Sequence, residues 1–128
     1  MNKITVPFNP IFKPVHQCKK RYVVMKGSAG SGKSVDTAQL YILRLMRDKG
    51  RNLVCVRKSD ITNRDSTFAE LESAINRMGV GRAWRVTQGP LSFTCINGNK
   101  IIFRGVNDNK QREKLKSITF ANGKLTDV

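Results

Sequence analysis

The feature that most constrains this chain is a glycine-rich octapeptide that lies between a short β-branched run and a long amphipathic segment. The octapeptide consists of Gly27, Ser28, Ala29, Gly30, Ser31, Gly32, Lys33 and Ser34, and it matches the phosphate-binding pattern G-x-x-x-x-G-K-S. The preceding run, RYVVMK, has the composition of a buried strand. Apolar residues then recur at helical spacing from Val35 to Met46. A strand, a glycine-rich turn and a helix in this order predict a phosphate-binding loop.

The residue types explain the chemistry that such a loop performs. Glycines let the backbone curl so that several N–H groups point at one phosphate. The first turn of the following helix adds unpaired N–H groups and a partial positive charge. Lys33 is expected to reach the β- and γ-phosphates, and the Ser34 hydroxyl is expected to ligate Mg²⁺. The octapeptide and Val35 therefore form a predicted site for ATP with Mg²⁺.

Adenine contacts in such folds often arise just ahead of the first strand, where Gln17 stands. A contact between Gln17 and the base is one reading, and a plain surface position is the other. The sequence leaves both open.

The order of the remaining segments predicts an α/β fold. Residues 1–20 contain Pro7, Pro10 and Pro14 and suggest an irregular lead-in. A second strand is expected at 52–57, and a second helix is expected to begin with Thr67 and Glu70 in capping-box spacing. Strands that alternate with helices are typical of a mainly parallel sheet. We therefore expect the fold of a P-loop NTPase, with helices flanking the sheet.

The last third of the chain adds antiparallel strands to this pattern. Three strand-like runs, WRVTQ, LSFTCI and KIIFRGV, follow one another, and Asn97-Gly98 between the last two predicts a hairpin. Trp84 and Phe93 lie in apolar strand patterns, so they are expected in the core rather than on a base-stacking surface. The whole chain, residues 1–128, is expected to be one incomplete domain.

Hydrolysis of a nucleotide needs acidic residues at the end of an apolar strand, one for Mg²⁺ and one for water. Asp60, Asp108 and Asp127 do not follow an apolar run of the required kind. The chain is therefore expected to bind ATP without hydrolysing it efficiently. Arg57, at the end of the second strand, is a candidate catalytic residue that would reach a nucleotide or a neighbouring subunit. A solvated arginine at a strand end is the alternative.

Charge points to a polyanionic partner. The chain carries 24 Lys and Arg against 9 Asp and Glu, a formal net charge of +15, which favours nucleic acid as a partner. A basic segment whose acidic counterpart lies elsewhere is the alternative. Arg112, Lys114 and Lys116 are candidate contacts to the DNA backbone or to a partner subunit, or else form a solvated helix face.

Other site classes have little support in the sequence. Three scattered cysteines without CxxC spacing, and a single histidine, argue against a structural zinc site. No apolar run reaches the roughly 18 residues of a membrane span, and the N-terminus lacks the apolar centre of a signal peptide. A soluble cytoplasmic protein is expected, with no membrane partner.

Four segments together resemble a known family: RYVVMKGSAGSGKS, NLVCVRKSDITNRDSTFAELESAI, NGNKIIFRGVNDNKQREKLKSI and GKLTDV. In this order they are similar to the N-terminal ATPase region of the large terminase subunit of tailed bacteriophages and prophages. The resemblance implies a motor that packages double-stranded DNA into procapsids with ATP. It further implies a terminase small subunit and a portal as partners, and the host cytoplasm as the location.

The resemblance also implies features that would lie outside this chain. In the family, the segment similar to LTDV leads into a pair of glutamates, and a separate C-terminal nuclease follows. The chain is therefore expected to be a truncated ATPase domain that lacks both. Many family members carry a basic residue in the loop at the position of Ala29, so a loop arginine is not expected to stabilise charge here.

Three readings remain open from the sequence. The first is the ATP-binding part of a packaging motor. The second is another P-loop protein, such as a small kinase or a helicase-like ATPase. The third is a basic DNA-binding remnant with a vestigial loop. Self-association through an exposed sheet edge is a further expectation.

Overall fold

The computed structural model describes residues 8–19, 23, 25–26, 32–57, 63–105, 113 and 118–128. Half of the predicted first strand, residues 21, 22 and 24, lies outside these residues, as do residues 27–31 of the predicted loop. Both therefore stay predictions. Within the described ranges, none of the helices combines the length and apolar character that crossing a bilayer requires.

A four-stranded mixed sheet forms the centre of the described structure. Its strands are β1 (Leu53–Arg57), β2 (Trp84–Gln88), β3 (Leu91–Cys95) and β4 (Lys100–Gly105), in the order β1-β4-β3-β2. β1 and β4 pair in parallel, whereas β4–β3 and β3–β2 pair antiparallel. The fold is thus mixed α/β. Among the described strands, one pair is parallel and two are antiparallel, so the mainly parallel sheet expected of a P-loop protein stays a prediction.

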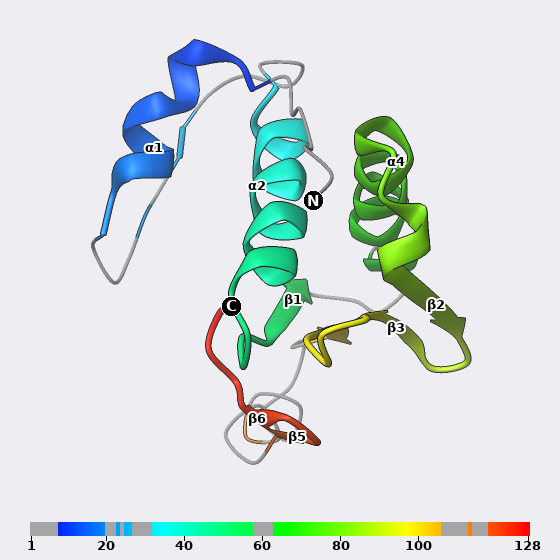
Figure 1. Cartoon of the computed structure of the whole chain (residues 1–128). Coiled ribbons are helices and arrows are strands. Elements are labelled where there is room, and N and C mark those ends of the chain that lie inside the picture. The colour runs from blue at the N-terminus through cyan, green and yellow to red at the C-terminus, as the bar shows by residue number, and fades with distance from the viewer. Residues whose placement is uncertain are drawn as a thin grey trace.

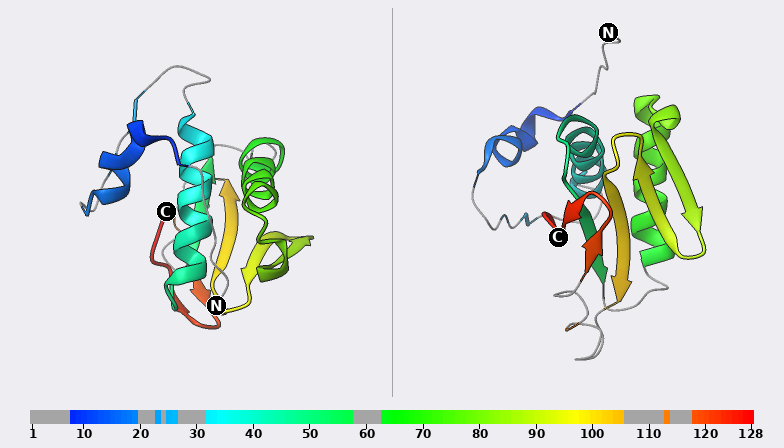
Figure 2. Two further views of the ribbon diagram at one scale, coloured as in Figure 1. Left: turned by 45° about the horizontal axis from the view of Figure 1, so that its top comes forward. Right: turned by 60° about the horizontal axis from the view of Figure 1, so that its bottom comes forward.

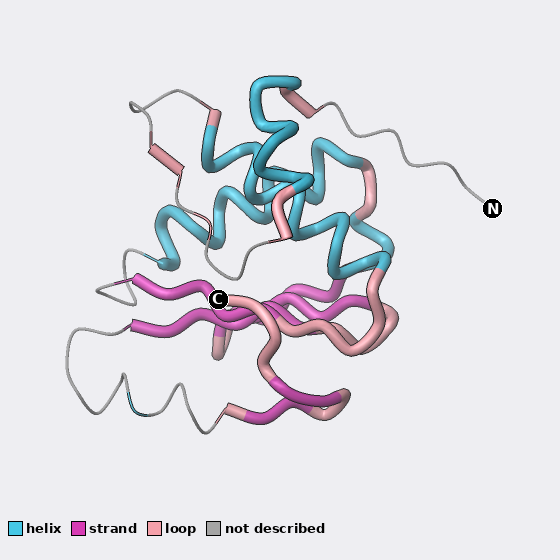
Figure 3. The backbone as a smooth tube through the Cα atoms, turned by 90° about the vertical axis from the view of Figure 1, so that its left-hand side faces the viewer, coloured by secondary structure: helices cyan, strands magenta, loops and turns pink. Residues whose placement is uncertain are grey.

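Two helices cover one face of this sheet. α2 (Lys33–Arg47) and α4 (Ala69–Met78) lie side by side on it, and Figures 1, 2 and 3 show both helices on the same side of the strands. A small hairpin of β5 (Thr119–Phe120) and β6 (Gly123–Lys124) lies on the opposite side of the sheet in Figure 3. The helices present apolar stripes to the sheet, as their 3.6-residue periodicity predicted.

The core lies between the helices and the sheet, and a group of aromatic residues lies within it. Phe93 is fully buried and stacks on Phe68 at a centroid distance of 4.8 Å. Trp84 meets the edge of Phe93 at 6.5 Å, and Phe103 lies 5.8 Å from Phe68. The expected core role of Trp84 and Phe93 is confirmed. Leu45, Leu71 and Ile101 belong to the same cluster.

The hairpin predicted at Asn97-Gly98 is confirmed between β3 and β4. Gly98 has a φ of 94°, which residues with a side chain rarely adopt. Asn97 and Asn99 beside it have a second role, because both donate side-chain hydrogen bonds to the carbonyl of Leu45 at the end of α2. The hairpin therefore fixes the C-terminal end of α2 against the sheet.

The lead-in differs from the irregular segment that the prolines suggested. It contains a 3-10 turn, η1 (Pro10–Phe12), and a short helix, α1 (Lys13–Gln17). Pro10 and Pro14 stand in the first turns of these elements, where a missing N–H costs no hydrogen bond. Prolines at these positions begin the helical turns rather than break them.

The start of α4 also differs from the sequence-based expectation. A π-helical turn, η2 (Asn63–Phe68), runs directly into α4, and no side chain caps the helix. The predicted capping box of Thr67 and Glu70 is therefore wrong. Phe68, just before α4, already has helical dihedral angles, so backbone carbonyls of the preceding turn stand where a cap would be needed. A further 3-10 turn, η3 (Gly81–Ala83), precedes β2.

The last described residues lie along the edge of β1 away from β4. Asp127 forms a parallel bridge with Leu53, and its carbonyl accepts a hydrogen bond from Val54 N–H at 3.0 Å. Thr126 is bonded to both backbone groups of Asn52 through its hydroxyl, at 2.9 and 3.0 Å. The start of β1 is thus paired on both sides.

Candidate functional site

The start of α2 has the backbone geometry expected at the end of a phosphate-binding loop. Gly32 is the N-cap residue, with φ 89° and ψ 4°. The first helical hydrogen bond runs from Asp36 N–H to the Gly32 carbonyl, at 2.9 Å. Ser34 and Val35 come before that bond, so their N–H groups have no carbonyl within the helix to bond. A left-handed glycine followed by such N–H groups can bind an anion.

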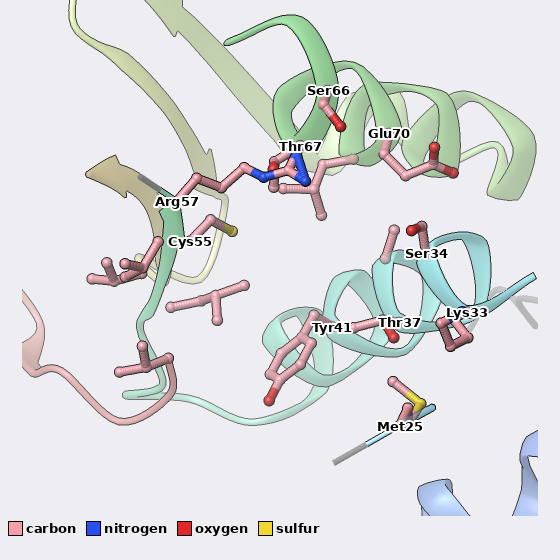
Figure 4. A pocket seen from close by; sticks show the side chains of 16 residues that line it. Met25, Lys33, Ser34, Thr37, Tyr41, Cys55, Arg57, Ser66, Thr67 and Glu70 are labelled. Carbon is pink, nitrogen blue, oxygen red and sulfur yellow. The ribbon is translucent and has the colours of Figure 1, made fainter. Parts of the chain in front are cut away.

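A cavity of about 650 Å³ opens beside this helix start, between α2, β1 and the beginning of α4. Figure 4 shows its labelled side chains projecting from α2, β1, η2 and α4, with Met25 added from the segment ahead of α2. Four polar side chains come from α2: Lys33, Ser34, Thr37 and Tyr41. Leu53 and Val54 add an apolar wall. A volume of this order can hold a small-molecule ligand.

The structure brings Arg57 to the same cavity as Lys33 and Ser34, although they lie more than twenty residues apart in sequence. Arg57 ends β1, and in Figure 4 its side chain extends toward Thr67 on the far wall. Since the carboxyl ends of parallel strands gather at one edge of a sheet, ligands commonly bind there. The catalytic role of Arg57 stays a prediction.

Sequence reasoning missed the far wall of the cavity, which Ser66, Thr67 and Glu70 form. In Figure 4, Glu70 lies on the α4 side and Ser34 on the α2 side, across the cavity from each other. The sequence did contain a signal for this wall. Thr67 and Ser66 lie three and four residues before Glu70, and this spacing places polar side chains on one face of a helix. Because Thr67 and Glu70 were interpreted as a capping box, they were not considered as residues of a binding site.

Gln17 lines a different cavity. This second cavity, also of about 650 Å³, lies between the lead-in and α2 and includes His16 and Arg44. It adjoins the first, since both are lined by the same four residues: Met25, Thr37, Tyr41 and Val128. The structure therefore does not bring Gln17 together with Lys33 and Ser34 in one cavity.

Burial keeps two titratable groups of the first cavity neutral. Desolvation raises the pKa of the Cys55 thiol to about 12. The pKa of Tyr41 is raised as well, first by burial and then by the negative charge of Asp127. Lys33, Arg57 and Glu70 are the lining residues whose side chains are ordinarily charged at neutral pH. The described lining thus carries an excess of positive charge, which favours an anionic ligand.

Several predicted site residues cannot be placed. Gly27, Ser28, Ala29, Gly30 and Ser31 lie outside the described residues, and so do Arg112, Lys114 and Lys116. Their predicted contacts with nucleotide, DNA or a partner subunit stay predictions.

Fold and site together define a mixed α/β protein with a candidate anion site where a glycine-capped helix meets the edge of a sheet. Comparison with known proteins identifies the family within this class. Residues 19–128 match the family described as phage terminase large subunit. The chain belongs to that family.

Two curated relatives support the assignment. The large terminase subunit of Bacillus phage SPP1 is 34% identical over 119 residues, which cover 92% of this chain and 28% of the relative. The PBSX phage terminase large subunit of Bacillus subtilis (strain 168) is 35% identical over 116 residues, covering 90% and 26%. The chain thus spans little more than a quarter of the length of these relatives. The resemblance seen in the sequence motifs is confirmed.

Proposed function

We propose that this chain is the ATP-binding part of a phage DNA-packaging motor, with ATP and Mg²⁺ bound by residues 27–35. Membership of the large terminase subunit family supports the motor assignment. The family implies three partners: double-stranded DNA, a terminase small subunit and a portal. The net charge of +15 would favour binding to the DNA phosphates.

One observation carries the nucleotide proposal: Lys33 and Ser34 stand in the first turn of α2 and line a cavity with an excess of positive charge. A triphosphate placed there would meet the partial positive charge of the helix start. Lys33 would pair with its outer phosphates, and Arg57 approaches the cavity from the end of β1. These are the charges that a polyphosphate requires.

The residues present also fit Mg²⁺. Magnesium prefers oxygen ligands and keeps several waters, and the cavity offers the hydroxyls of Ser34, Thr37 and Thr67 with the carboxylate of Glu70. Mg²⁺ held by these oxygens would neutralise part of the negative charge of the outer phosphates. Ser34 is the residue we assign to hold it, because it directly follows Lys33 in the helix start.

Turnover by this chain is proposed to be slow. β1 ends in Arg57 and β4 ends in Gly105, so neither of these parallel strands ends in a carboxylate. Without a carboxylate at either of these strand ends to orient water, the chain is expected to bind ATP much faster than it hydrolyses it. Lys33 and Arg57 are then residues for charge stabilisation rather than for proton transfer.

The test is a thermal shift measured with Mg-ATP. At ligand concentrations of about 100 times the Kd, binding stabilises the wild type by about 2.7 kcal/mol. Lys33→Ala and Ser34→Ala are expected to lose most of the shift. Lys49→Ala is a matched control, since Lys49 is exposed just past the other end of α2. Equal shifts for wild type and Lys33→Ala would overturn the proposal.

The two other readings give different results with the same protein. Transfer of phosphate to an acceptor would indicate a kinase. Salt-sensitive duplex binding that nucleotide does not alter, without any shift by Mg-ATP, would indicate a DNA-binding remnant.

A further inference from the structure

A largely buried hydrogen bond between His16 and Asp36 joins the lead-in to the first turn of α2. Nε2 of His16 lies 2.7 Å from Oδ2 and 2.9 Å from Oδ1 of Asp36. The side chain of Asp36 is only 3% exposed and that of His16 only 18%. A carboxylate only accepts hydrogen bonds, so Nε2 carries the hydrogen and donates to both oxygens. Phe8 packs its ring against His16 at a centroid distance of 4.5 Å.

A second contact joins the same two segments. The ring of Phe12 covers Gly32, with its Cε2 atom 3.6 Å from the point where a Cβ on Gly32 would stand. Phe12 is itself buried. The lead-in thus contacts α2 at Gly32 and at Asp36, and these two positions bracket Lys33 and Ser34 in the sequence.

The hydrogen bond between His16 and Asp36 is costly to break. A buried carboxylate that loses its hydrogen-bond donor retains the full penalty of desolvation. A lone carboxylate in the first turn would also repel an anion bound at the same helix end. His16 reduces both the desolvation penalty of Asp36 and its repulsion of an anion, because its hydrogen bonds satisfy the carboxylate and direct it toward the lead-in.

We propose that His16 is a positioning residue for phosphate binding, which holds the first turn of α2 through Asp36 while Phe12 holds Gly32. The proposal rests on the proposed nucleotide function but concerns a different part of the chain. It assigns the lead-in, residues 8–18, a role in binding that does not require contact with a base.

Inorganic tripolyphosphate with Mg²⁺ is the probe that tests this role, since it has no base. His16→Ala is expected to weaken its affinity about tenfold, the size of effect that loss of a charge-assisted hydrogen bond produces. His16→Gln keeps a donor and is expected to recover most of the affinity. Gln88→Ala is the control, because Gln88 is exposed at the end of β2 and lines neither cavity, and no change is expected there.

Stability must be separated from positioning. All affinities are to be measured below the melting transition of each variant. A lower Tm for His16→Ala with unchanged affinity of the folded protein would overturn the proposal, as would failure of His16→Gln to recover any affinity.

Amide hydrogen exchange gives a readout that needs no nucleotide. His16→Ala is expected to speed exchange of the Asp36 N–H, which bonds to the Gly32 carbonyl, while the Asp48 N–H at the other end of α2 exchanges as before. An unchanged exchange rate of the Asp36 N–H would overturn the proposal that His16 holds the first turn of α2. If the wild-type protein binds neither tripolyphosphate nor ATP, the proposed function is wrong. The exchange rate of the Asp36 N–H then tests by itself whether His16 holds the first turn of α2.

Discussion

The side-chain amide of Asn99 donates a hydrogen bond of 2.7 Å to the backbone carbonyl of Leu45, joining the β3–β4 hairpin to the end of α2. Its Nδ2 also donates to the carbonyl of Asp48, and its Oδ1 accepts from the N–H groups of Gly50 and Arg51 at 2.9 and 3.0 Å. Asn99 is fully buried. This one side chain thus bonds the carbonyls of Leu45 and Asp48, the first of which it shares with Asn97, and the N–H groups of the turn beyond the helix.

Replacement of Asn99 by alanine should therefore destabilise the fold strongly. Each buried group left without a partner costs about 1–3 kcal/mol, and several would be left at once, so we expect a loss of about 3–5 kcal/mol in the free energy of unfolding. Urea unfolding measures it. Asn76→Ala, at an exposed position of α4, should change the free energy by less than about 0.5 kcal/mol; a similar loss in both variants would contradict the prediction.

Gly32 should not tolerate a side chain. Its φ of 89° places it in the left-handed region, where a residue with a Cβ pays about 1–2 kcal/mol. Gly32→Ala is expected to lower the free energy of unfolding by this amount and to reduce the Mg-ATP shift. Gly81→Ala is the control, since φ there is not positive and an added Cβ meets nothing within 4 Å. Equal stability of the two variants would disprove the strain.

Cys55 should make stability fall at alkaline pH. Burial raises its pKa from 9.0 to about 12, so the unfolded thiol ionises before the folded one. Its stabilising contribution is complete below about pH 9 and is lost as pH rises toward 12, with a slope of up to about 1.4 kcal/mol per pH unit. Unfolding at several pH values should show a steeper decline in wild type than in Cys55→Ala. Parallel curves would refute this assignment.

Arg57 and Glu70 should affect nucleotide affinity in opposite directions. Both line the first cavity, so removal of the Arg57 charge should weaken binding of ATP without metal, and removal of the Glu70 charge should strengthen it. We expect about tenfold changes for Arg57→Ala and Glu70→Gln. Calorimetric titration measures both. Exposed residues supply the controls, Arg85→Ala and Glu72→Gln; effects of the same size in the controls would show only a change in net charge.

Much of the local structure followed from the sequence. The β-branched runs, the 3.6-residue stripes and Asn97-Gly98 have short-range physical causes, and they predicted β1, α2 and the β3–β4 hairpin within a residue or two. The octapeptide likewise placed Lys33 and Ser34 at a helix start. In these cases propensity and pattern agreed with the final packing.

The errors concerned the residues at which helical elements begin. Thr67 and Glu70 have the spacing of a capping box, yet the π-helical turn ahead of α4 supplies backbone partners and leaves those side chains on the cavity wall. Pro10 and Pro14 suggested irregular chain, yet each stands in the first turn of a helical element. A local pattern does not reveal which neighbour satisfies a helix end.

By itself, the sequence determined the family, the basic character and the position of Lys33 and Ser34 at the head of a helix, because motifs, charge and periodicity are properties of consecutive residues. Only the tertiary structure decided that Arg57 and Glu70 share a cavity with them, that Asn99 closes the end of α2, and that His16 holds Asp36. Each of these relations joins separate segments, and packing of α2 and α4 on one sheet face brings them together.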